Sequence, residues 1–548
     1  MRVDLVWIQT IHRSPPIWGL GEVYGCGAQP ALVAAAALER SPGAEFVLFW
    51  DAALGDPDEA TVAAVARSSG DVWHAGLALG MGGLPSMIDH VDPVWRFNRD
   101  PGPDVVASAR PTSWRLSLRA CLVRATVLDR LGGPDPHFDT LAGASLEMGH
   151  RWVRRGALMR HVSELLPPLS ASTTAAVTLN DEIRFLHLRY GRMWTAWACW
   201  RRGRRGGGLT ETWRAFRRAQ HPGVTPPAAS LHPAESAMIN GDRPAVSVLI
   251  PTLDRYPHLF NLLGQLREQT VQPLEIVVID QSAAEIYDSE WPLRFADLPL
   301  RVIRREKPGQ CSSRNAGLET VRGEMVLFLD DDDEIQPDLI WQHLAFVERF
   351  AADASCGVAE EVGTGPLPPA FMLVRDSDVF PTNNTLLKTV MLAGSGLFDL
   401  AFERGERADH DLGMRLYLSG ANLVLNPAAS VVHLHAPRGG LRRHRARVVT
   451  RSSSRASIRE RQLLAPTEGY LWQRYFTSGQ IEEALLIRTI GTLRGSGPRG
   501  RRLLRAVLMA VMLPDTWRQN RIRLARGRAM MNEFPAIPEY APGQVEGL

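Results

Sequence analysis

The sequence predicts an α/β protein built on a doubly wound, mostly parallel sheet that occurs twice in the chain. Three observations predict it. Short β-branched runs alternate with amphipathic helical stretches, one such run ends in four consecutive aspartates, and segments of the first third recur in the same order further along. An arginine-rich helical stretch with a Pro- and Ala-rich linker separates the copies, and a basic helical region follows them.

The second copy has the clearer pattern of strands and helices. Its expected strands are 246–250, 276–279, 301–304 and 325–329. A helix is expected over 258–269, and another runs to residue 321. Parallel sheets of this kind bind ligands at the carboxyl ends of their strands. Because the last strand leads directly into Asp330-Asp-Asp-Asp333, we expect the functional site at that edge.

The internal repeat has three matching pairs of segments. They are Glu45–Asp51 with Glu324–Asp330, Gly132–Phe138 with Gly396–Phe402, and Gly149–Gly156 with Gly413–Gly420. Three matches in one order indicate a duplicated domain. The sequence therefore predicts four parts: a degenerate domain at 1–165, a helical segment and linker at 166–243, a complete domain at 244–445, and a basic helical region at 446–548.

Composition excludes several classes of protein. The net charge of the 548 residues is +3, so a basic surface for nucleic acid is not expected. The five scattered cysteines form no CxxC pair, which excludes a disulfide scaffold and argues against a cysteine-built zinc site. No apolar run reaches the roughly 18 residues of a membrane span. Asp4 interrupts the N-terminus where a secretory signal needs its apolar core, so we expect a cytoplasmic protein.

The four aspartates can form a metal site. Acids crowded at a strand end repel one another unless a cation compensates. Hard carboxylate ligands suit Mg²⁺ or Mn²⁺, especially when phosphates of a substrate complete the shell. A solvated acidic turn is the alternative for an isolated run, so the neighbouring motifs decide between them.

The acids belong to one of six motifs, which follow one another along the chain. They are Pro251-Thr-Leu-Asp-Arg255, Asp280-Gln-Ser282, Gly309-Gln-Cys-Ser-Ser-Arg-Asn-Ala-Gly317, Phe328-Leu-Asp-Asp-Asp-Asp333, Ala408-Asp-His-Asp-Leu412 and His433-Leu-His-Ala-Pro-Arg-Gly-Gly440. Over about 244–445 the chain resembles the family 2 glycosyltransferases, inverting enzymes of the GT-A fold. The match departs from the family pattern at Ala408, where a glutamate is usual, and at Ile279, where an acid is frequent.

The resemblance implies roles for individual residues. The implied nucleotide-sugar-binding residues are Thr252, Asp254, Asp280, Arg314, Asn315, Asp330 and Asp331. Asp332 and His433 are the implied metal ligands for Mn²⁺ or Mg²⁺, with His435 as an alternative. Asp409 is the implied catalytic base, and Asp411 is its rival.

The resemblance implies transfer of a sugar from a nucleotide diphosphate donor to a glycan or lipid-linked acceptor, in surface polysaccharide or glycoconjugate synthesis. Direct displacement at the anomeric carbon needs one carboxylate as general base and a cation on the leaving diphosphate. A nucleotidyltransferase is the alternative enzyme, but residues 251–261 lack the glycines of its phosphate loop. A non-catalytic sugar- or partner-binding scaffold suits the first copy better than the second.

The first copy lacks the chemistry of the second. The repeat places Ala52 and Ala53 on Asp331 and Asp332, and Ser145 on Asp409. We therefore expect a catalytically silent domain, although Glu147, on Asp411, leaves open a displaced base. Arginine clusters at 201–205, 442–447 and 518–528 leave open a peripheral contact with anionic lipid on the inner face of the membrane.

Overall fold

The computed structural model divides into two compact units. Unit 1 comprises Met1–Pro233 with Leu373–Asp376, and unit 2 comprises Ala234–Met372 with Ser377–Leu548. The structure describes residues 1–167, 175–224, 231–232, 243–363, 365–436, 459–495 and 497–541. Most of the predicted linker before Pro244, the last residues of the sixth motif and the 442–447 arginines lie outside these ranges.

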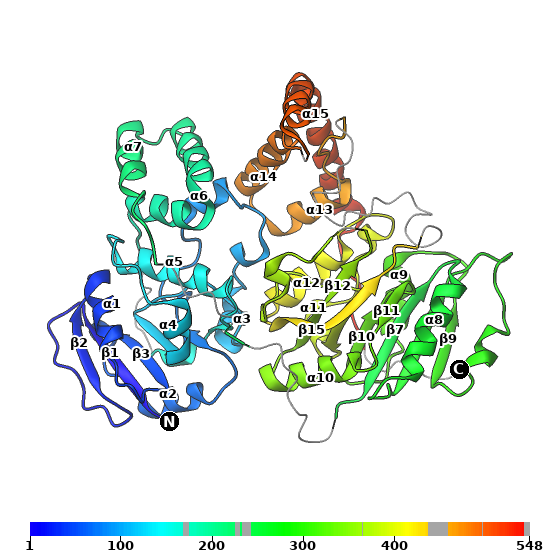
Figure 1. Ribbon diagram of the computed structural model, residues 1–548, viewed down its shortest axis with the longest axis horizontal. Helices are drawn as coiled ribbons and strands as arrows, with labels where there is room; N and C mark the ends of the chain where they lie inside the picture. The colour runs from blue at the N-terminus through cyan, green and yellow to red at the C-terminus, as the bar shows by residue number, and fades with distance from the viewer. Residues whose placement is uncertain are drawn as a thin grey trace. The chain divides into compact units, whose positions relative to one another are not determined.

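Unit 1 is a mixed sheet with helices, followed by a helical pair (Figure 1). Its strands are β1 Val3–Gln9, β2 Val23–Gly27, β3 Phe46–Asp51, β4 Val72–His74, β5 Ala120–Arg124 and β6 Met159–His161. Its α-helices are α1 Pro30–Leu38, α2 Glu59–Ala66, α3 Pro103–Ser108, α4 Ala125–Leu131, α5 Leu141–Val153, α6 Leu179–Arg204 and α7 Leu209–Arg218. The strand order across the sheet is β2-β1-β3-β5-β4-β6.

Unit 2 has a larger sheet and a helical C-terminal region. The strands on the main path of the sheet are β7 Val246–Thr252, β8 Glu275–Asp280, β9 Leu300–Arg304, β10 Met325–Leu329, β11 Asp333–Ile335, β12 Ala354–Glu361, β14 Asn384–Lys388 and β15 Leu423–His433. The helices are α8 Tyr256–Arg267, α9 Gln310–Leu318, α10 Leu339–Phe350, α11 Met391–Ser395, α12 Ala408–Leu418, α13 Pro466–Tyr475, α14 Ser478–Gly491 and α15 Arg499–Glu533. The order is β11-β15-β12-β14-β10-β7-β8-β9.

The two sheets share one topology. The path β8-β7-β10-β14-β12-β15 of unit 2 repeats the path β2-β1-β3-β5-β4-β6 of unit 1. The strand directions agree between the two paths. Strand β3 pairs in parallel with β1 and antiparallel with β5, and β10 likewise pairs in parallel with β7 and antiparallel with β14. The predicted α/β fold in two copies, with helical additions, is confirmed.

Both sheets contain the same hydrogen bond between an aspartate carboxylate and a backbone N–H. In unit 1 the carboxylate of Asp71 accepts a hydrogen bond of 2.8 Å from the backbone N–H of Leu158. In unit 2 Asp353 accepts one of 2.9 Å from Asn422, which occupies the matching place. Asp71 directly precedes β4, which pairs in parallel with β6, and Asp353 directly precedes β12, which pairs in parallel with β15. A repeated interaction at this level indicates duplication rather than a shared general architecture.

Apolar periodicity explains how unit 2 positions its site. The helix expected over 258–269 is α8, whose buried leucines at 259, 262, 263 and 266 pack with β7, β8 and β10 in one core. Strands β7, β8, β9 and β10 run parallel to one another. Their carboxyl ends therefore meet at one edge, where Thr252, Asp280 and Asp330 follow buried strands.

Unit 1 contains buried neutral histidines, which make its stability depend on pH. Burial lowers the pKa of His74 to about 4 and that of His161 to about 3. In the unfolded chain both titrate near 6.5, so between the two values the unfolded state binds more protons and stability falls as pH decreases below 6.5. At pH 5 we expect a loss of roughly 2 kcal/mol for each histidine relative to pH 7.5. Urea unfolding followed by tryptophan fluorescence at both pH values measures it.

The variant His161→Leu tests this prediction. The strand register places Leu425 of unit 2 at the position of His161, so leucine is the residue that the fold already accepts there. This variant is expected to lose the contribution of His161, roughly 2 kcal/mol at pH 5, and to keep those of His74 and the buried His150. His221→Gln, at an exposed position of unit 1, keeps the whole dependence. An unchanged pH dependence in His161→Leu would contradict the assignment.

Candidate active site

The acidic cluster is held by the loop after β7. The hydroxyl of Thr252 donates a hydrogen bond of 2.8 Å to Asp331, and the guanidinium of Arg255 lies 3.0 Å from the other oxygen of the same carboxylate. Burial raises the pKa of Asp331 to about 7, with Asp332 adding to the shift and Arg255 opposing it. Thr252 and Asp331, both predicted to bind nucleotide, are thus buried and bonded to each other.

Asp332 has one oxygen that accepts no hydrogen bond and lies beside a guanidinium group. Its Oδ2 accepts a hydrogen bond of 2.8 Å from the backbone N–H of Ala436. Its Oδ1 is buried and accepts no hydrogen bond among the described residues, although the Arg255 guanidinium lies 3.0 Å away. A buried carboxylate oxygen with no hydrogen bond needs a cation beside it, which Arg255 supplies here and which a divalent metal ion could also supply.

His433 lies between two acids from neighbouring strands. Its cross-strand partners are Asp333 on β11 and Glu361 on β12. Its Nδ1 lies 2.9 Å from Asp333 Oδ1 and 3.9 Å from Asp332 Oδ1. Burial opposes the charged imidazole, but the hydrogen bond to Asp333 and the surrounding carboxylates raise the pKa of His433 to about 10.

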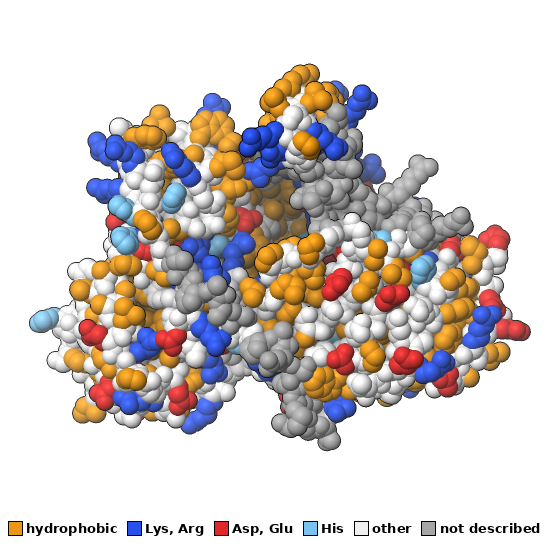
Figure 2. All heavy atoms as spheres, in the orientation of Figure 1, with side chains coloured by type: hydrophobic (Ala, Val, Ile, Leu, Met, Phe, Trp, Pro, Cys, Tyr) orange, Lys and Arg blue, Asp and Glu red, His pale blue; other side chains and the backbone are white. Residues whose placement is uncertain are grey.

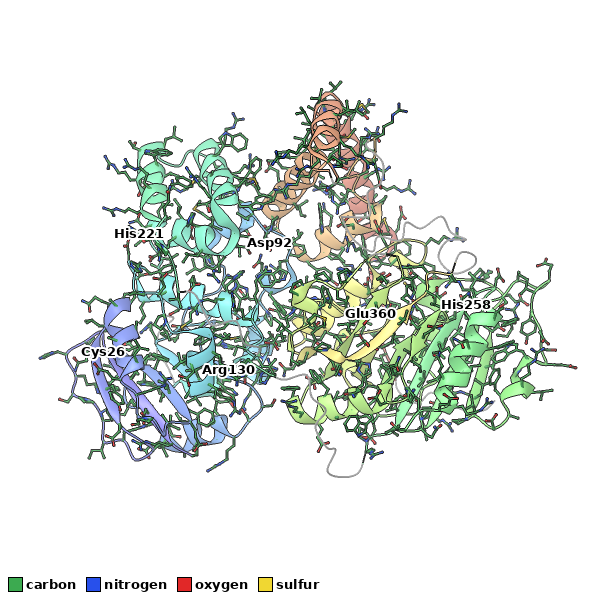
Figure 3. The ribbon with its side chains drawn as sticks, in the orientation of Figure 1. Cys26, Asp92, Arg130, His221, His258 and Glu360 are labelled. Atoms are coloured by element: carbon green, nitrogen blue, oxygen red, sulfur yellow. The ribbon has the colours of Figure 1, made fainter. Side chains whose placement is uncertain are left out.

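Glu361 is a candidate ligand that sequence reasoning missed. One potential ligand atom each from Glu361, His433 and His435 lie within 4.8 Å of one another. Glu361 also contacts His435 directly. Glu361 is the last residue of β12 and follows Glu360, which Figure 3 labels. Glu361 lies beside His433 because β12 pairs in parallel with β15. No sequence motif around Glu361 predicts that pairing.

These residues fit a divalent cation. The Glu361 carboxylate and the imidazoles of His433 and His435 form a mixed oxygen and nitrogen donor set, and Asp332 Oδ1 lies 3.9 Å from His433 Nδ1 beside it. Carboxylates suit Mg²⁺ and Mn²⁺, and imidazole favours transition metals, so the set as a whole favours Mn²⁺. His433, predicted as a ligand, and His435, its alternative, are both beside Asp332.

Asp330 is the accessible acid of the predicted donor site, and the buried Arg314 binds it. Arg314 on α9 donates a hydrogen bond of 2.6 Å to Asp330, whose side chain is 30% exposed. Asp254 has a left-handed backbone with φ of 58° and accepts a hydrogen bond of 2.8 Å from the N–H of Ala283. It therefore joins the loops that follow β7 and β8, at the same edge of the sheet.

Asp280 and Asn315 are committed to internal bonds. Asp280 is fully buried and accepts hydrogen bonds from the Tyr256 hydroxyl and the Trp291 indole at 2.7 and 3.2 Å. The amide of Asn315 both donates to and accepts from the backbone of Phe398, each at 2.8 Å. These contacts give both side chains a structural role, and their predicted contact with a nucleotide stays a prediction.

Asp409 lies in the first turn of α12 and is 36% exposed. His410 Nδ1 lies 3.0 Å from its carboxylate, and Arg407 lies 3.1 Å from the other ring nitrogen of His410. Burial opposes ionisation, but His410 and Arg407 hold the pKa of Asp409 well below its usual value. Arg407 has a left-handed backbone with φ of 87°, a strained conformation beside a candidate base. Its carboxylate is partly exposed and oriented by an imidazole, as a proton acceptor requires, while the lowered pKa makes it a weaker base than an ordinary aspartate.

Asp411, the rival base, is locked in an ion pair. It is fully buried, and one oxygen accepts hydrogen bonds of 2.9 and 2.8 Å from Arg415. The other oxygen accepts one of 2.7 Å from the Tyr475 hydroxyl. Arg415 also donates to the backbone carbonyl of Ser395. Both oxygens are thus used to hold α12, and neither is accessible to an acceptor.

Unit 1 keeps this ion pair and lacks the accessible acid. Arg151 binds Glu147 one helical turn away in α5 and donates to the carbonyl of Leu131, which matches Ser395 in the repeat. At the position of Asp409 stands Ser145, whose hydroxyl donates to the carbonyl of Leu141. The pair is therefore part of the fold, and Glu147 does not supply a displaced base.

The acid at the end of β3 is also occupied. Asp51 accepts hydrogen bonds from Arg119 at 2.6 Å and from the N–H of Ala53 at 2.9 Å, and it contacts Thr10. Ala52 and Ala53 follow it, so no second carboxylate stands where unit 2 has Asp332.

The fold and the acidic edge of unit 2 define a GT-A type domain. Residues 247–398 match the model of the glycosyl transferase family 2, so this part of the chain is a family 2 glycosyltransferase domain. The Bacillus subtilis protein EpsH, named as a glycosyltransferase, is 34% identical over 125 residues, which cover 22% of this chain and 35% of that protein. The amylovoran biosynthesis glycosyltransferase AmsB of Erwinia amylovora is 31% identical over 111 residues, or 19% of this chain and 36% of that protein.

The chain spans about a third of the length of these relatives. Among solved structures, a mannosyltransferase of Pyrobaculum calidifontis in complex with GDP-Man and Mn²⁺ aligns at 19% identity with a TM-score of 0.34, over 61% of this chain and 97% of that one. A similarity of this size has no bearing on function.

Proposed function

We propose that unit 2 is a metal-dependent, inverting glycosyltransferase that moves a sugar from a nucleotide diphosphate donor to a hydroxyl of a glycan or lipid-linked acceptor, in surface polysaccharide or glycoconjugate synthesis. The observation that carries the proposal is a family 2 match over residues 247–398 that contains Asp332, whose buried Oδ1 accepts no hydrogen bond, followed in the same unit by the partly exposed carboxylate of Asp409. One group suits a cation and the other suits a proton.

The residues divide the reaction between them. Asp409 accepts the proton of the attacking hydroxyl, and His410, held by Arg407, orients its carboxylate. Asp330 and Arg314 line the donor side, and Asp254 holds the two loops at that edge. Asp332, with His433, His435 and Glu361, would hold a divalent cation, which offsets the negative charge of the leaving diphosphate.

Thermal unfolding with a panel of nucleotide sugars tests the proposal. A donor at 100 times its Kd adds roughly 2.7 kcal/mol to the stability of the folded state. We expect one class of nucleotide sugar to raise the melting temperature in the presence of Mn²⁺ and to lose that effect when a chelator is added. A panel without any such response would contradict the proposal, whereas the free sugars serve as the control.

Unit 1 is proposed to be a silent copy that serves as a scaffold or an acceptor-binding module. What supports this is the occupied Asp51, the alanines that follow it and Ser145 at the position of the base. Nothing at Ala53 could hold the cation that offsets diphosphate charge.

Peripheral contact with anionic lipid is proposed for α15. Its first half has an exposed apolar stripe at Leu503, Leu504, Val507 and Val511, with exposed fractions of 68, 58, 59 and 76%. Arginines 499, 501 and 502 adjoin the stripe, and no acid occurs before Asp515. Figure 2 shows apolar and cationic side chains together over α14 and α15. No described helix is both long and apolar enough to cross a membrane.

Vesicle co-sedimentation measures this contact. We expect binding to phosphatidylglycerol vesicles and little to neutral ones, because each cation near an anionic surface contributes about 1 kcal/mol. Val507→Asp places an acid within the stripe and is expected to release the protein. Ile522→Asp, exposed on the same helix outside the stripe, is the matched control. Equal binding of both variants would rule out the stripe as the contact.

A further inference from the structure

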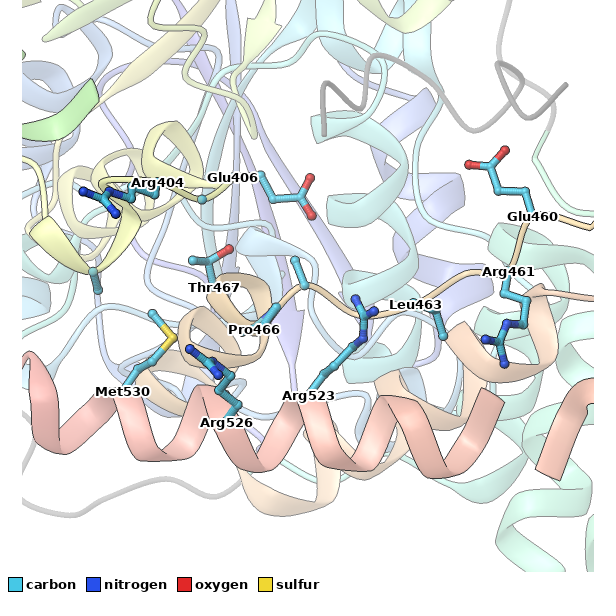
Figure 4. A pocket seen from close by; sticks show the side chains of 13 residues that line it. Arg404, Glu406, Glu460, Arg461, Leu463, Pro466, Thr467, Arg523, Arg526 and Met530 are labelled. Carbon is cyan, nitrogen blue, oxygen red and sulfur yellow. The ribbon is translucent and has the colours of Figure 1, made fainter. Parts of the chain in front are cut away.

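A cavity of about 640 Å³ lies between the loop before α12 and the helices α13 and α15 (Figure 4). Its charged lining consists of Arg404, Glu406, Glu460, Arg461, Arg523 and Arg526. Its size is typical of a small-molecule site. None of the acids or histidines assigned above to the donor, the metal or the base lines it.

The cavity has an excess of positive charge. Four arginines and two glutamates line it, so the lining carries two net positive charges, one of which Asp515 offsets from outside through Arg461. Arg461 pairs with Asp515, and Arg523 donates a hydrogen bond of 3.3 Å to the carbonyl of Leu464.

Two of the arginines have no carboxylate of their own. The side chains of Arg404 and Arg526 form no hydrogen bond or ion pair with any described residue. In Figure 4, Arg523 and Arg526 extend from α15 toward the segment that carries Pro466 and Thr467, and Arg404 stands on the facing side. Guanidinium groups from separate elements around one cavity are the arrangement that binds phosphate.

The loop that lines this cavity leads directly to the candidate base. Glu403 lies in the same loop and accepts hydrogen bonds of 2.8 and 2.9 Å from the N–H groups of Cys311 and Ser312, in the first turn of α9. Arg314 of that helix binds Asp330. One side of the loop thus contacts the helix of the donor site, and the other side lines the cavity. The chain then enters α12, where Asp409 is the second residue.

We propose that this cavity is an anion subsite that binds a phosphate group carried by the acceptor. The proposal rests on the proposed glycosyl transfer, because it names the class of acceptor: a phosphorylated one, whose phosphate is held by Arg404, Arg523 and Arg526 while its hydroxyl meets Asp409. Glu406 and Glu460 in the lining disfavour further negative charge, so a single phosphate or diphosphate suits the cavity better than a polyanion.

Calorimetry on the full chain, with a chelator present and no donor, tests the subsite. The probes are inorganic pyrophosphate and monomeric short-chain phosphatidic acid. The double variant Arg404→Gln/Arg526→Gln is expected to weaken binding at least tenfold. Arg528→Gln, exposed on the same helix outside the cavity, is expected to bind like the wild type. If the double variant loses affinity for both probes, the cavity is a general phosphate site. If it loses affinity for phosphatidic acid alone, the cavity binds a lipid phosphate.

Equal binding by the double variant and the wild type would overturn the subsite, as would the absence of binding by the wild type. Donor binding with Mn²⁺, measured in parallel, keeps the two proposals separate. The donor affinity of the double variant is expected to stay within twofold of the wild-type value. If the donor affinity falls as far as the affinity for the phosphate probes, these arginines belong to the donor site and the subsite is overturned. A wild type that binds pyrophosphate but no nucleotide sugar would reject the glycosyl transfer alone.

Discussion

Asp332→Asn is expected to abolish sugar transfer and to remove the effect of Mn²⁺ on donor binding. The substitution takes a negative charge from the only acid of the cluster with a buried oxygen that accepts no hydrogen bond in the described chain. An amide is a weak ligand for a hard divalent cation, while its size and its bond to Ala436 are little changed. Calorimetry with Mn²⁺ alone, and then with the donor, measures both effects.

Two neighbouring glutamates supply a graded comparison. Glu361→Gln is expected to lower Mn²⁺ affinity by about 10- to 100-fold, the range for groups that support a metal site. Glu360→Gln is the matched control, because successive side chains of a strand point to opposite faces and Glu360 is exposed. If Asp332→Asn keeps the metal-dependent affinity of the wild type, the cation is not bound at this carboxylate.

The fold could be predicted because its signals are local. Apolar runs such as 246–250 and 325–329 are buried strands here, and the leucine spacing of 258–269 is the buried face of α8. The duplication was visible from three short matches, and the shared strand order confirms it. The antiparallel place of β14 between β10 and β12 had no comparable signal, since strand pairing depends on contacts far apart in the chain.

The candidate site could be predicted only in part. Motifs identified which acids follow which strands, but not which of their oxygens are already used. Asp280 and Asn315 are bonded internally through Trp291 and Phe398, partners that no motif contains. Glu361 reaches His433 through strand pairing alone. A sequence specifies residue types at an edge, whereas accessibility depends on the side chains that pack around them.

Asp409→Asn is expected to lower kcat by about 10²- to 10⁴-fold, the usual contribution of a general base. The side chain is partly exposed and, among the described residues, is bonded to His410 alone, so the melting temperature and donor affinity should stay close to those of the wild type. Steady-state kinetics with thermal unfolding separates the two effects. A variant with full activity would place the base elsewhere.

Asp411→Asn is expected to show the opposite signature. It breaks a buried pair and leaves Arg415 without its carboxylate, at a cost of about 3–5 kcal/mol of stability. Activity per folded molecule should fall less than in Asp409→Asn. A reversed order would mean that the base lies two residues further along α12.

Glu147→Gln is the matched control for both variants, because it breaks the same buried pair with Arg151 in unit 1. It is expected to destabilise unit 1 and leave the activity of folded molecules unchanged. The residual activity of Asp409→Asn also tests whether unit 1 is catalytically silent. Ser145 cannot replace a carboxylate as a base, so the activity that remains in Asp409→Asn should not fall further when Glu147 is also replaced. A further loss in that double variant would show that unit 1 contributes catalysis of its own, through the acid that its buried ion pair now holds.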